Sequence, residues 1–272
     1  MTTTVSTAIA QWVTQTSYES LPGHIKAEAR KALINSIGTA IGAFPLEDAR
    51  RAVAYAAAQH STGPATVLVS GHKLPTGLAA WVNGVLLNNL GQEETHLLSV
   101  THPSETTVPV VLALAEQLGS SGPEVLGALT IGIETAIAVS SMALVPAVKY
   151  DRCEAPAVYG TIGATAAAAK LLGLDMPSTA HALGLAATFA AGLSEGIRVG
   201  TDEYHFIVAL ASQHAELAAS LAQRGAIAAA TAFEGEGGFY HLFPGISRED
   251  LAGYDAAGDI TRRLGHEWAY RS

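Results

Sequence analysis

The sequence has little cysteine, few aromatic residues and few charged ones, and each shortage narrows the possible classes of protein. Of its 272 residues, 14% are charged, 6% are aromatic and one, Cys153, is a cysteine. A single cysteine excludes an internal disulfide. Catalysis by Cys153 would need an adjacent base and a lowered thiol pKa, so a plain buried or surface thiol is the simpler interpretation, although Lys149 and Arg152 are close in the sequence.

Basic residues are in the minority. Lys and Arg number 15 against 24 Asp and Glu, giving a formal net charge of −9. No basic stripe is present to neutralise phosphates, which argues against nucleic acid as a partner. An anionic substrate would have to find local cations. No spacing of His, Cys or carboxylates compels a metal site, and no phosphate-binding loop or dinucleotide fingerprint is present, so we expect neither a metal nor a cofactor.

Targeting and membrane signals are also weak. The N-terminus, Met1 to Thr4, has no basic region and no signal-peptide core. The longest apolar run, 128–148, reaches the length of a membrane span. However, Glu134 lies within it, Ser140 and Ser141 interrupt it, and no flanking Lys/Arg pair orients it. We therefore expect a buried helix in a soluble, cytoplasmic protein, with no membrane partner.

Small apolar residues are abundant: 49% of the chain is hydrophobic and much of it is alanine. Such side chains allow close approach between helices. Helical periodicity dominates, and the only convincing strand is a short one at 65–69. The sequence therefore predicts an all-α fold, a single domain over 1–272. The expected helices cover residues 5–14, 22–41, 48–60, 76–89, 106–118, 122–143, 155–173, 177–192, 206–224 and 227–234.

The segment from Glu93 to Ser104 concentrates the chemistry of the chain. Two carboxylates and two histidines fall within ten positions there, between two apolar helical patterns. Groups of different pKa held close together on rigid supports are what a proton-transfer site needs. The alternative is a solvated loop with a helix N-cap at Thr101 or Ser104. The cluster alone does not decide between them.

Four segments together resemble one known family. The segment 93–104 is similar to that family's acidic cluster followed by THPS. Residues 160–174 resemble its glycine-alanine helix, 181–193 the next helix, and 200–225 the segment after that. The chain thus resembles the MmgE/PrpD family over roughly residues 5–270. That family includes 2-methylcitrate dehydratase, cis-aconitate decarboxylase and iminodisuccinate epimerase. The resemblance implies a helical domain and acid/base chemistry on small carboxylates without a metal.

The resemblance assigns roles around the HPS stretch. His102 matches the family's histidine there, which implies an acid/base role, and imidazole has a suitable pKa. Glu93 and Glu94 stand where relatives have adjacent aspartates. Glu93 is expected to orient His102 or His96, and Glu94 and His96 to contact the substrate, with His96 at the rim. A longer side chain moves the carboxylate by more than about an ångström, enough to alter a mechanism.

Two other positions depart from the family pattern. Relatives carry a histidine shortly before the glycine-alanine block, where this chain has Glu154, with Tyr159 directly before the block. Relatives carry a lysine after the glycine at 200, where this chain has Tyr204 followed by His205. A phenol binds anions much more weakly than an ammonium does. We expect Tyr204 and His205 to serve as a donor/base pair.

Three further residues are expected to contact the substrate in this altered site. Arg198 is a candidate replacement for the missing cation, unless it is simply a surface arginine on a loop. Thr201 follows the glycine of the same segment, and Tyr159 stands before the glycine-alanine block. A phenol or carboxylate near 154–159 would replace an imidazole only with a changed pKa or role.

Together with these residues, the resemblance implies a metal-independent lyase, similar to a dehydratase or decarboxylase, or an isomerase. It would act on a small organic molecule with His102, Tyr204, His205 and Glu93 as catalytic groups. A homodimer is expected from the resemblance. Relatives continue into a lid domain after a glycine-rich link like 235–240, so one alternative is a subunit whose partner chain brings the lid. A non-catalytic helical binding protein is the other.

Overall fold

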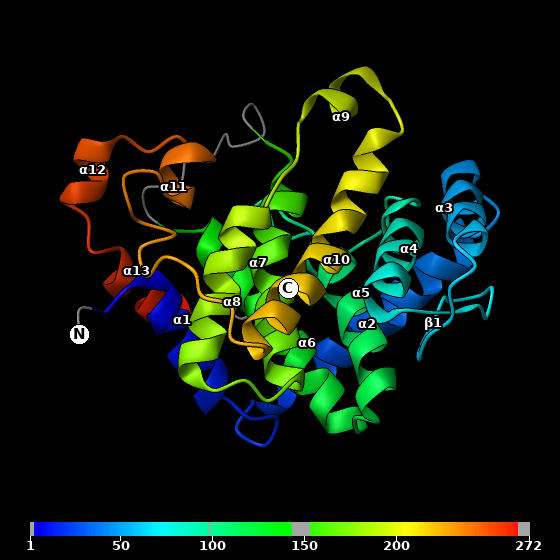
Figure 1. Ribbon diagram of the computed structural model, residues 1–272, viewed down its shortest axis with the longest axis horizontal. Helices are drawn as coiled ribbons and strands as arrows, with labels where there is room; N and C mark the ends of the chain where they lie inside the picture. The colour runs from blue at the N-terminus through cyan, green and yellow to red at the C-terminus, as the bar shows by residue number, and fades with distance from the viewer. Residues whose placement is uncertain (1–2, 98, 143–152, 266–272) are drawn as a thin grey trace.

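The computed structural model describes residues 3–97, 99–142 and 153–265, and the fold of this part is all-α, which confirms the predicted class (Figure 1). Two very short strands accompany the helices. The elements are α1 (Val5–Gln15), α2 (Gly23–Ala43), α3 (Glu47–Ala58), β1 (Ala65–Thr66), β2 (Lys73–Leu74), α4 (Thr76–Asn88), α5 (Pro103–Leu118), α6 (Gly122–Ser140), α7 (Ala155–Leu171), α8 (Met176–Phe189), α9 (Glu195–Val199), α10 (Glu203–Gln223), α11 (Phe239–Leu242), α12 (Arg248–Ala252) and α13 (Ala256–Arg263).

Helix α7 forms the centre of the core. Every residue from Ala155 to Ala169 is buried, and α5, α6, α8 and α10 pack around it. Helices α6 and α7 cross at two glycines: a Cβ on Gly163 would lie 2.4 Å from the carbonyl oxygen of Gly132. Only residues without a side chain allow the two backbones to approach this closely. The alanine and glycine content of the chain thus becomes a tightly packed helical core.

Two contacts hold α10 against its neighbours. A Cβ on Gly84 of α4 would lie 2.9 Å from Cα of Ala209, so α4 and α10 meet backbone to backbone. On another side, the Ser212 hydroxyl donates a 2.7 Å hydrogen bond to the carbonyl of Thr106 in α5. These contacts fix how the ends of α4, α5 and α10 lie relative to one another.

Helix α6 is the one described helix that is long and apolar enough to cross a membrane. Its most apolar window is 78% buried inside the protein, where it packs against α7 and α5. A core helix of this kind satisfies the same length and composition test. Glu134, in the middle of the helix, accepts a 3.0 Å hydrogen bond from the backbone N–H of Gly265.

The two ends of the described chain pack together. Helix α1 lies beside α13, and both contribute to one apolar cluster with α7, α8 and the segment 233–246 (Figure 1). Val5, Ile9 and Ile260 are fully buried in it. Cys153 belongs to the same cluster and is buried. It is therefore a plain buried thiol, one of the two alternatives that the sequence offered.

The predicted strand at 65–69 is present but shorter. Ala65 pairs with Leu74 and Thr66 with Lys73 in an antiparallel register. The backbone N–H of Val67 still bonds the carbonyl of His72 at 2.8 Å, but Val69 has a φ of +64° and the chain turns there. A left-handed conformation at a β-branched residue ends any extended run.

The predicted helix at 227–234 is wrong. Residues 227–229 have no regular structure and 230–234 form turns. The left-handed Gly225, with a φ of +89°, ends α10. The backbone groups that follow bond elsewhere: the N–H of Ala228 donates to His181 Nδ1, and the carbonyls of Ala232 and Phe233 accept from the start of α11. Alanine favours a helix locally, but these tertiary bonds override that preference.

Several boundaries also differ from the predictions. Helix α5 begins at Pro103 rather than 106, and α10 begins at Glu203 rather than 206. Helix α8 ends at Phe189 rather than 192. Helix α6 ends at Ser140, and residue 143, the expected end, lies outside the described residues. The short helices α9 and α11 to α13 were not predicted.

Candidate active site

The candidate site lies where four helix ends meet. Helix α4 ends at Asn88, and α5 begins with its N-cap at His102. Helix α7 has Glu154 as its N-cap, and Tyr204 lies in the first turn of α10. The carboxyl groups of Glu93, Glu94, Glu105 and Glu154 act electrostatically on one another or on Tyr204, which groups them in one region. We call these four residues the glutamate cluster.

The loop that leads into α5 is a tight turn. His96 and Thr101 form an isolated antiparallel bridge, in which the N–H of His96 donates to the carbonyl of Thr101 at 3.0 Å. Inside the turn, the N–H of Ser99 donates to Nδ1 of His96 at 3.2 Å. Val100 has a φ of +48°, which a β-branched residue rarely adopts. Backbone strain of this kind is common at functional sites.

His102 is held in one tautomer. Its Nδ1 lies 3.1 Å from the carbonyl oxygen of Glu94 and 3.2 Å from the hydroxyl of Thr95. A carbonyl can only accept, so Nδ1 carries the proton and Nε2 has the lone pair. Burial lowers the pKa of His102 below its ordinary value. At neutral pH the ring is therefore uncharged, with Nε2 able to take a proton.

Glu94 is tied to the start of α5. One of its oxygens accepts from the backbone N–H of Ser104 at 2.6 Å, and the other accepts from the Ser104 hydroxyl. Burial nevertheless raises the pKa of Glu94 to about 7. Burial raises the pKa of Glu93 to about 7 as well, with a further contribution from the negative charge of Glu94. One carboxyl oxygen of Glu93 is buried and bonds to no described group.

Asn88 connects three of the side chains. Its Nδ2 donates to one oxygen of Glu105 at 2.7 Å and lies 3.4 Å from the hydroxyl of Tyr204. Its Oδ1 accepts from Nδ1 of His205 at 2.5 Å, so Nε2 of His205 has the lone pair. Burial lowers the pKa of His205 and raises that of Tyr204 well above its ordinary value. At neutral pH the phenol is a donor and the imidazole is neutral.

Glu105 and Glu154 are the most deeply buried acids of the cluster, with 0% and 1% of their surface exposed. Each has one carboxyl oxygen that bonds to no described group. Burial raises the pKa of Glu105 well above its ordinary range, helped by the charges of Glu93, Glu94 and Glu154. Burial alone raises the pKa of Glu154 to about 7. Glu154 therefore exchanges its proton near neutral pH, and Glu105 keeps its proton to a higher pH than an ordinary carboxyl group does.

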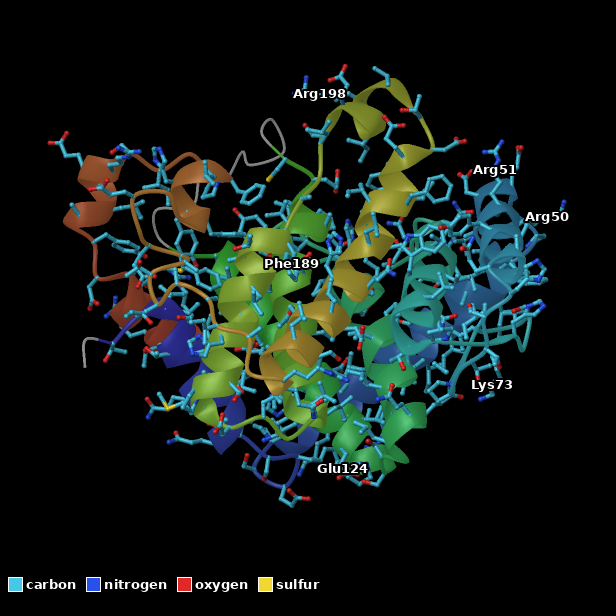
Figure 2. All side chains as sticks on the ribbon, viewed as in Figure 1. Arg50, Arg51, Lys73, Glu124, Phe189 and Arg198 are labelled. Carbon is cyan, nitrogen blue, oxygen red and sulfur yellow. The ribbon has the colours of Figure 1, made fainter. Side chains whose placement is uncertain are left out.

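The structure does not bring all the expected residues together. Tyr159 lies in the core, with its ring 5.6 Å from that of Phe239 in an edge-to-face contact. Arg198 lies on α9 at the outer end of the molecule (Figure 2). Thr201 lines a hollow of about 320 Å³ together with Tyr204 and His205. His96 stays half-buried in its turn.

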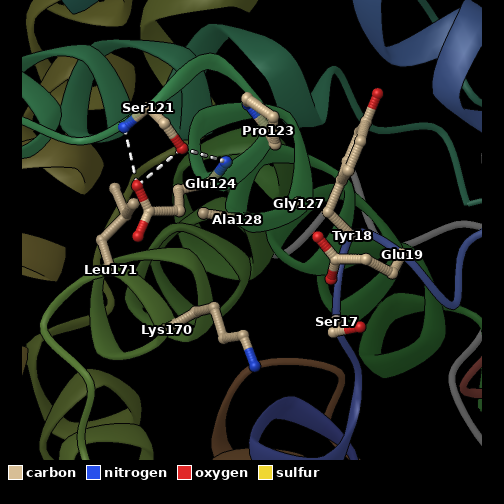
Figure 3. A pocket seen from close by; sticks show the side chains of 10 residues that line it. All are labelled: Ser17, Tyr18, Glu19, Ser121, Pro123, Glu124, Gly127, Ala128, Lys170 and Leu171. Atoms are coloured by element: carbon tan, nitrogen blue, oxygen red, sulfur yellow. Dashed lines mark hydrogen bonds between the residues drawn. The ribbon is translucent and has the colours of Figure 1, made fainter.

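A second hollow, of about 510 Å³, lies between the α1–α2 connection, the start of α6 and the end of α7 (Figure 3). None of the candidate residues lines it. Ser121 and Glu124 form a capping box on its wall, and the amine of Lys170 donates to the carbonyl of Val13 at 3.0 Å. Its polar groups thus complete helix ends, which is a structural role.

Two site residues went unnoticed in the sequence: Asn88 and Glu105. Glu105 directly follows the HPS stretch and is the only acid in the first turn of α5. An acid between the HPS stretch and the apolar run 108–115 was a usable signal, because a buried acid needs a hydrogen-bond partner or a function. Asn88 gave no comparable signal. Glu154 was placed near the altered histidine position, without a role.

The side chains of the site form an acid/base centre on an all-α framework. It offers two neutral imidazoles, a phenol donor and several carboxyl groups that exchange protons near neutral pH. Such a set can remove a proton from carbon and return one. Among the described residues, no three His, Cys, Asp or Glu side chains are grouped so that they would hold a metal ion.

Comparison with known proteins gives the family. The N-terminal domain of the MmgE/PrpD family matches residues 7–249, and the chain belongs to that family. It is 31% identical to cis-aconitate decarboxylase of Mus musculus over 188 residues and 32% identical to that of Homo sapiens over 183. These matches cover 68% and 66% of this chain.

A longer match is to the cis-aconitate decarboxylase-like protein oryM of Aspergillus oryzae, 25% identical over 97% of this chain. The three matches cover 38%, 37% and 56% of those relatives. The chain therefore spans between about a third and about half the length of the curated relatives it matches.

Proposed function

We propose that this chain carries the acid/base centre of a lyase that acts on a small organic acid or carbonyl compound. The observation that carries the proposal is His102, whose ring is neutral, fixed in one tautomer and placed beside buried proton-exchanging carboxyls. Membership of the family and the similarity to proteins named cis-aconitate decarboxylase support lyase chemistry.

In the proposed reaction, Nε2 of His102 removes a proton from the carbon next to a carboxyl or carbonyl group. Negative charge then develops on the oxygen of that group. The phenol of Tyr204, kept protonated by its raised pKa, donates a hydrogen bond to this oxygen. A protonated carboxyl of the glutamate cluster returns a proton where a leaving group departs. His205, held by Asn88, is a second base in the same region.

This assignment departs from the expected roles at one point. Glu93 was expected to orient His102 or His96, but the partners of the His102 ring are the backbone carbonyl of Glu94 and the hydroxyl of Thr95. We therefore propose that Glu93, with a pKa of about 7 and a carboxyl oxygen that bonds to no described group, takes part in proton exchange instead.

The test is turnover of a panel of small acids, including cis-aconitate, followed by proton NMR in D2O. Deuterium entering the carbon beside the carboxyl group reports proton transfer, and the products show whether CO2, water or only a proton is lost. We expect His102→Ala to lower the rate by about 10² to 10⁴, the usual contribution of a general base. His72→Ala, at an exposed position on the hairpin, should leave it unchanged.

A full rate in His102→Ala would contradict the proposal. The variant must be shown to be folded by its circular dichroism, because the His102 ring ties the start of α5 to the carbonyl of Glu94.

A further inference from the structure

The glutamate cluster contains more buried acceptor oxygens than the protein satisfies. One oxygen each of Glu93, Glu105 and Glu154 is buried and bonds to no described group. Leaving such an atom without a partner costs about 1–3 kcal/mol, and more where the group is charged. Three such atoms in one region are unusual, because buried polar groups are nearly always hydrogen-bonded. Donors from a bound molecule would satisfy them.

Among the residues that the structure describes, every cation lies outside an ion pair with these acids. Arg51 is engaged by Glu47, Asp48 and Asp202 on the side of α3. Lys73 bonds Glu116 near the hairpin, and Arg198 lies out on α9 (Figure 2).

The helix N-termini give the site some positive charge, but less than the negative charge of four ionised carboxyl groups. Helices α5, α7 and α10 all begin at the site, and each N-terminus carries about half a positive charge. The four carboxyl groups supply up to one negative charge each. The helix ends therefore favour ionised glutamates, and the ionised cluster would still be negative overall.

A compact metal ion does not fit this arrangement. The described residues include no group of three possible metal ligands close enough to share an ion. The acids are linked electrostatically and through Asn88 and Tyr204, over a wider region. An extended organic cation, with several N–H donors and a carbon skeleton, can reach across such a region. The Tyr204 ring adds a face on which an ammonium can rest.

We propose that the substrate of this site carries an ammonium group, which Glu105 and Glu154 bind through their unpartnered carboxyl oxygens. This inference rests on the proposed function and names its substrate class: a small organic acid or carbonyl compound that is also an amine. The carbon that loses its proton lies toward His102, and the ammonium lies toward α7 and α10. Tyr204 lies near Glu105, because the amide of Asn88 contacts both side chains.

The test uses three probes with the same four-carbon skeleton: 1,4-diaminobutane, 4-aminobutanoate and succinate. Binding to the purified chain is measured by calorimetry at pH 7.5 in 150 mM salt. We expect both ammonium-bearing probes to bind at least about ten-fold more tightly than succinate. Glu105→Gln and Glu154→Gln should each weaken the binding of 1,4-diaminobutane by about ten-fold or more. A bound ammonium favours the ionised form of each carboxyl group, and each variant loses that ionic hydrogen bond.

Glu249→Gln is the matched control, since it removes one charge from the surface on α12. It should leave all three affinities unchanged. Tighter binding of succinate than of the two amines would overturn the inference, as would equal loss in Glu249→Gln, or no binding of either amine. Because no turnover is involved, these outcomes are independent of the His102→Ala test of the acid/base centre.

Discussion

The shifted pKa of a single site residue is expected to change how the stability of the chain depends on pH. Burial raises the pKa of Glu154 to about 7, so between about pH 4.5 and 7 the folded chain holds a proton that the unfolded chain has lost. This stabilising contribution is complete at low pH and disappears as the pH rises through 7. Glu154→Gln should therefore become more stable relative to the unchanged chain from pH 5 to 8, by about 1–3 kcal/mol.

The measurement is urea unfolding of both chains at several pH values. The difference in free energy of unfolding between the two chains is compared, because His102, His205 and His214 change the stability of both chains with pH in the opposite direction to Glu154. Burial lowers the pKa of each, so they destabilise the fold as the pH falls below about 6.5. A difference that stays flat from pH 5 to 8 would show that Glu154 keeps an ordinary pKa.

At the scale of elements, the crossing of α6 and α7 is expected to be the least tolerant point of the core. A Cβ at Gly163 would meet the backbone of Gly132 at 2.4 Å, and backbone cannot move aside as a flexible side chain can. Gly163→Ala should lower the free energy of unfolding by about 3 kcal/mol. Gly38→Ala, in the open middle of α2, should raise it by about 0.5–1 kcal/mol.

Chemical denaturation of the two variants measures both effects. The same Gly→Ala substitution in two helix interiors should then change the free energy of unfolding in opposite directions. If Gly163→Ala were as stable as the unchanged chain, the close crossing of α6 and α7 would be refuted.

The sequence predicted those elements whose structure depends on local spacing, and missed those that depend on packing between elements. Helices with regular apolar spacing were found, since periodicity is a local property. The segment 227–234 was wrongly predicted as a helix, because its conformation depends on hydrogen bonds to His181 and α11, which are distant in sequence. The site divides in the same way. Glu93 and His102 are neighbours in sequence and were recognised together, whereas Asn88, Glu105 and Glu154 meet only when α4, α5 and α7 pack.

At the scale of the whole molecule, the two ends of the described chain are expected to unfold together with the core. Helix α13 lies beyond the family match, which ends at residue 249, yet it packs on α1 and Ile260 is fully buried there. Ile260→Ala should lower the free energy of unfolding by about 2–5 kcal/mol, in one cooperative transition. Ile227→Ala, at a position 77% exposed, should change it by less than about 0.5 kcal/mol.

Hydrogen exchange separates this expectation from a loosely attached end. If α13 is part of the cooperative unit, amides in α1 and α7 lose protection in Ile260→Ala by the same free energy as global unfolding. If α13 were an independent appendage, only the amides of α13 itself would exchange faster, and α7 would keep its protection. The shared burial of Val5, Ile9 and Ile260 in one cluster favours the first result, because a cavity there removes contacts from both ends of the chain.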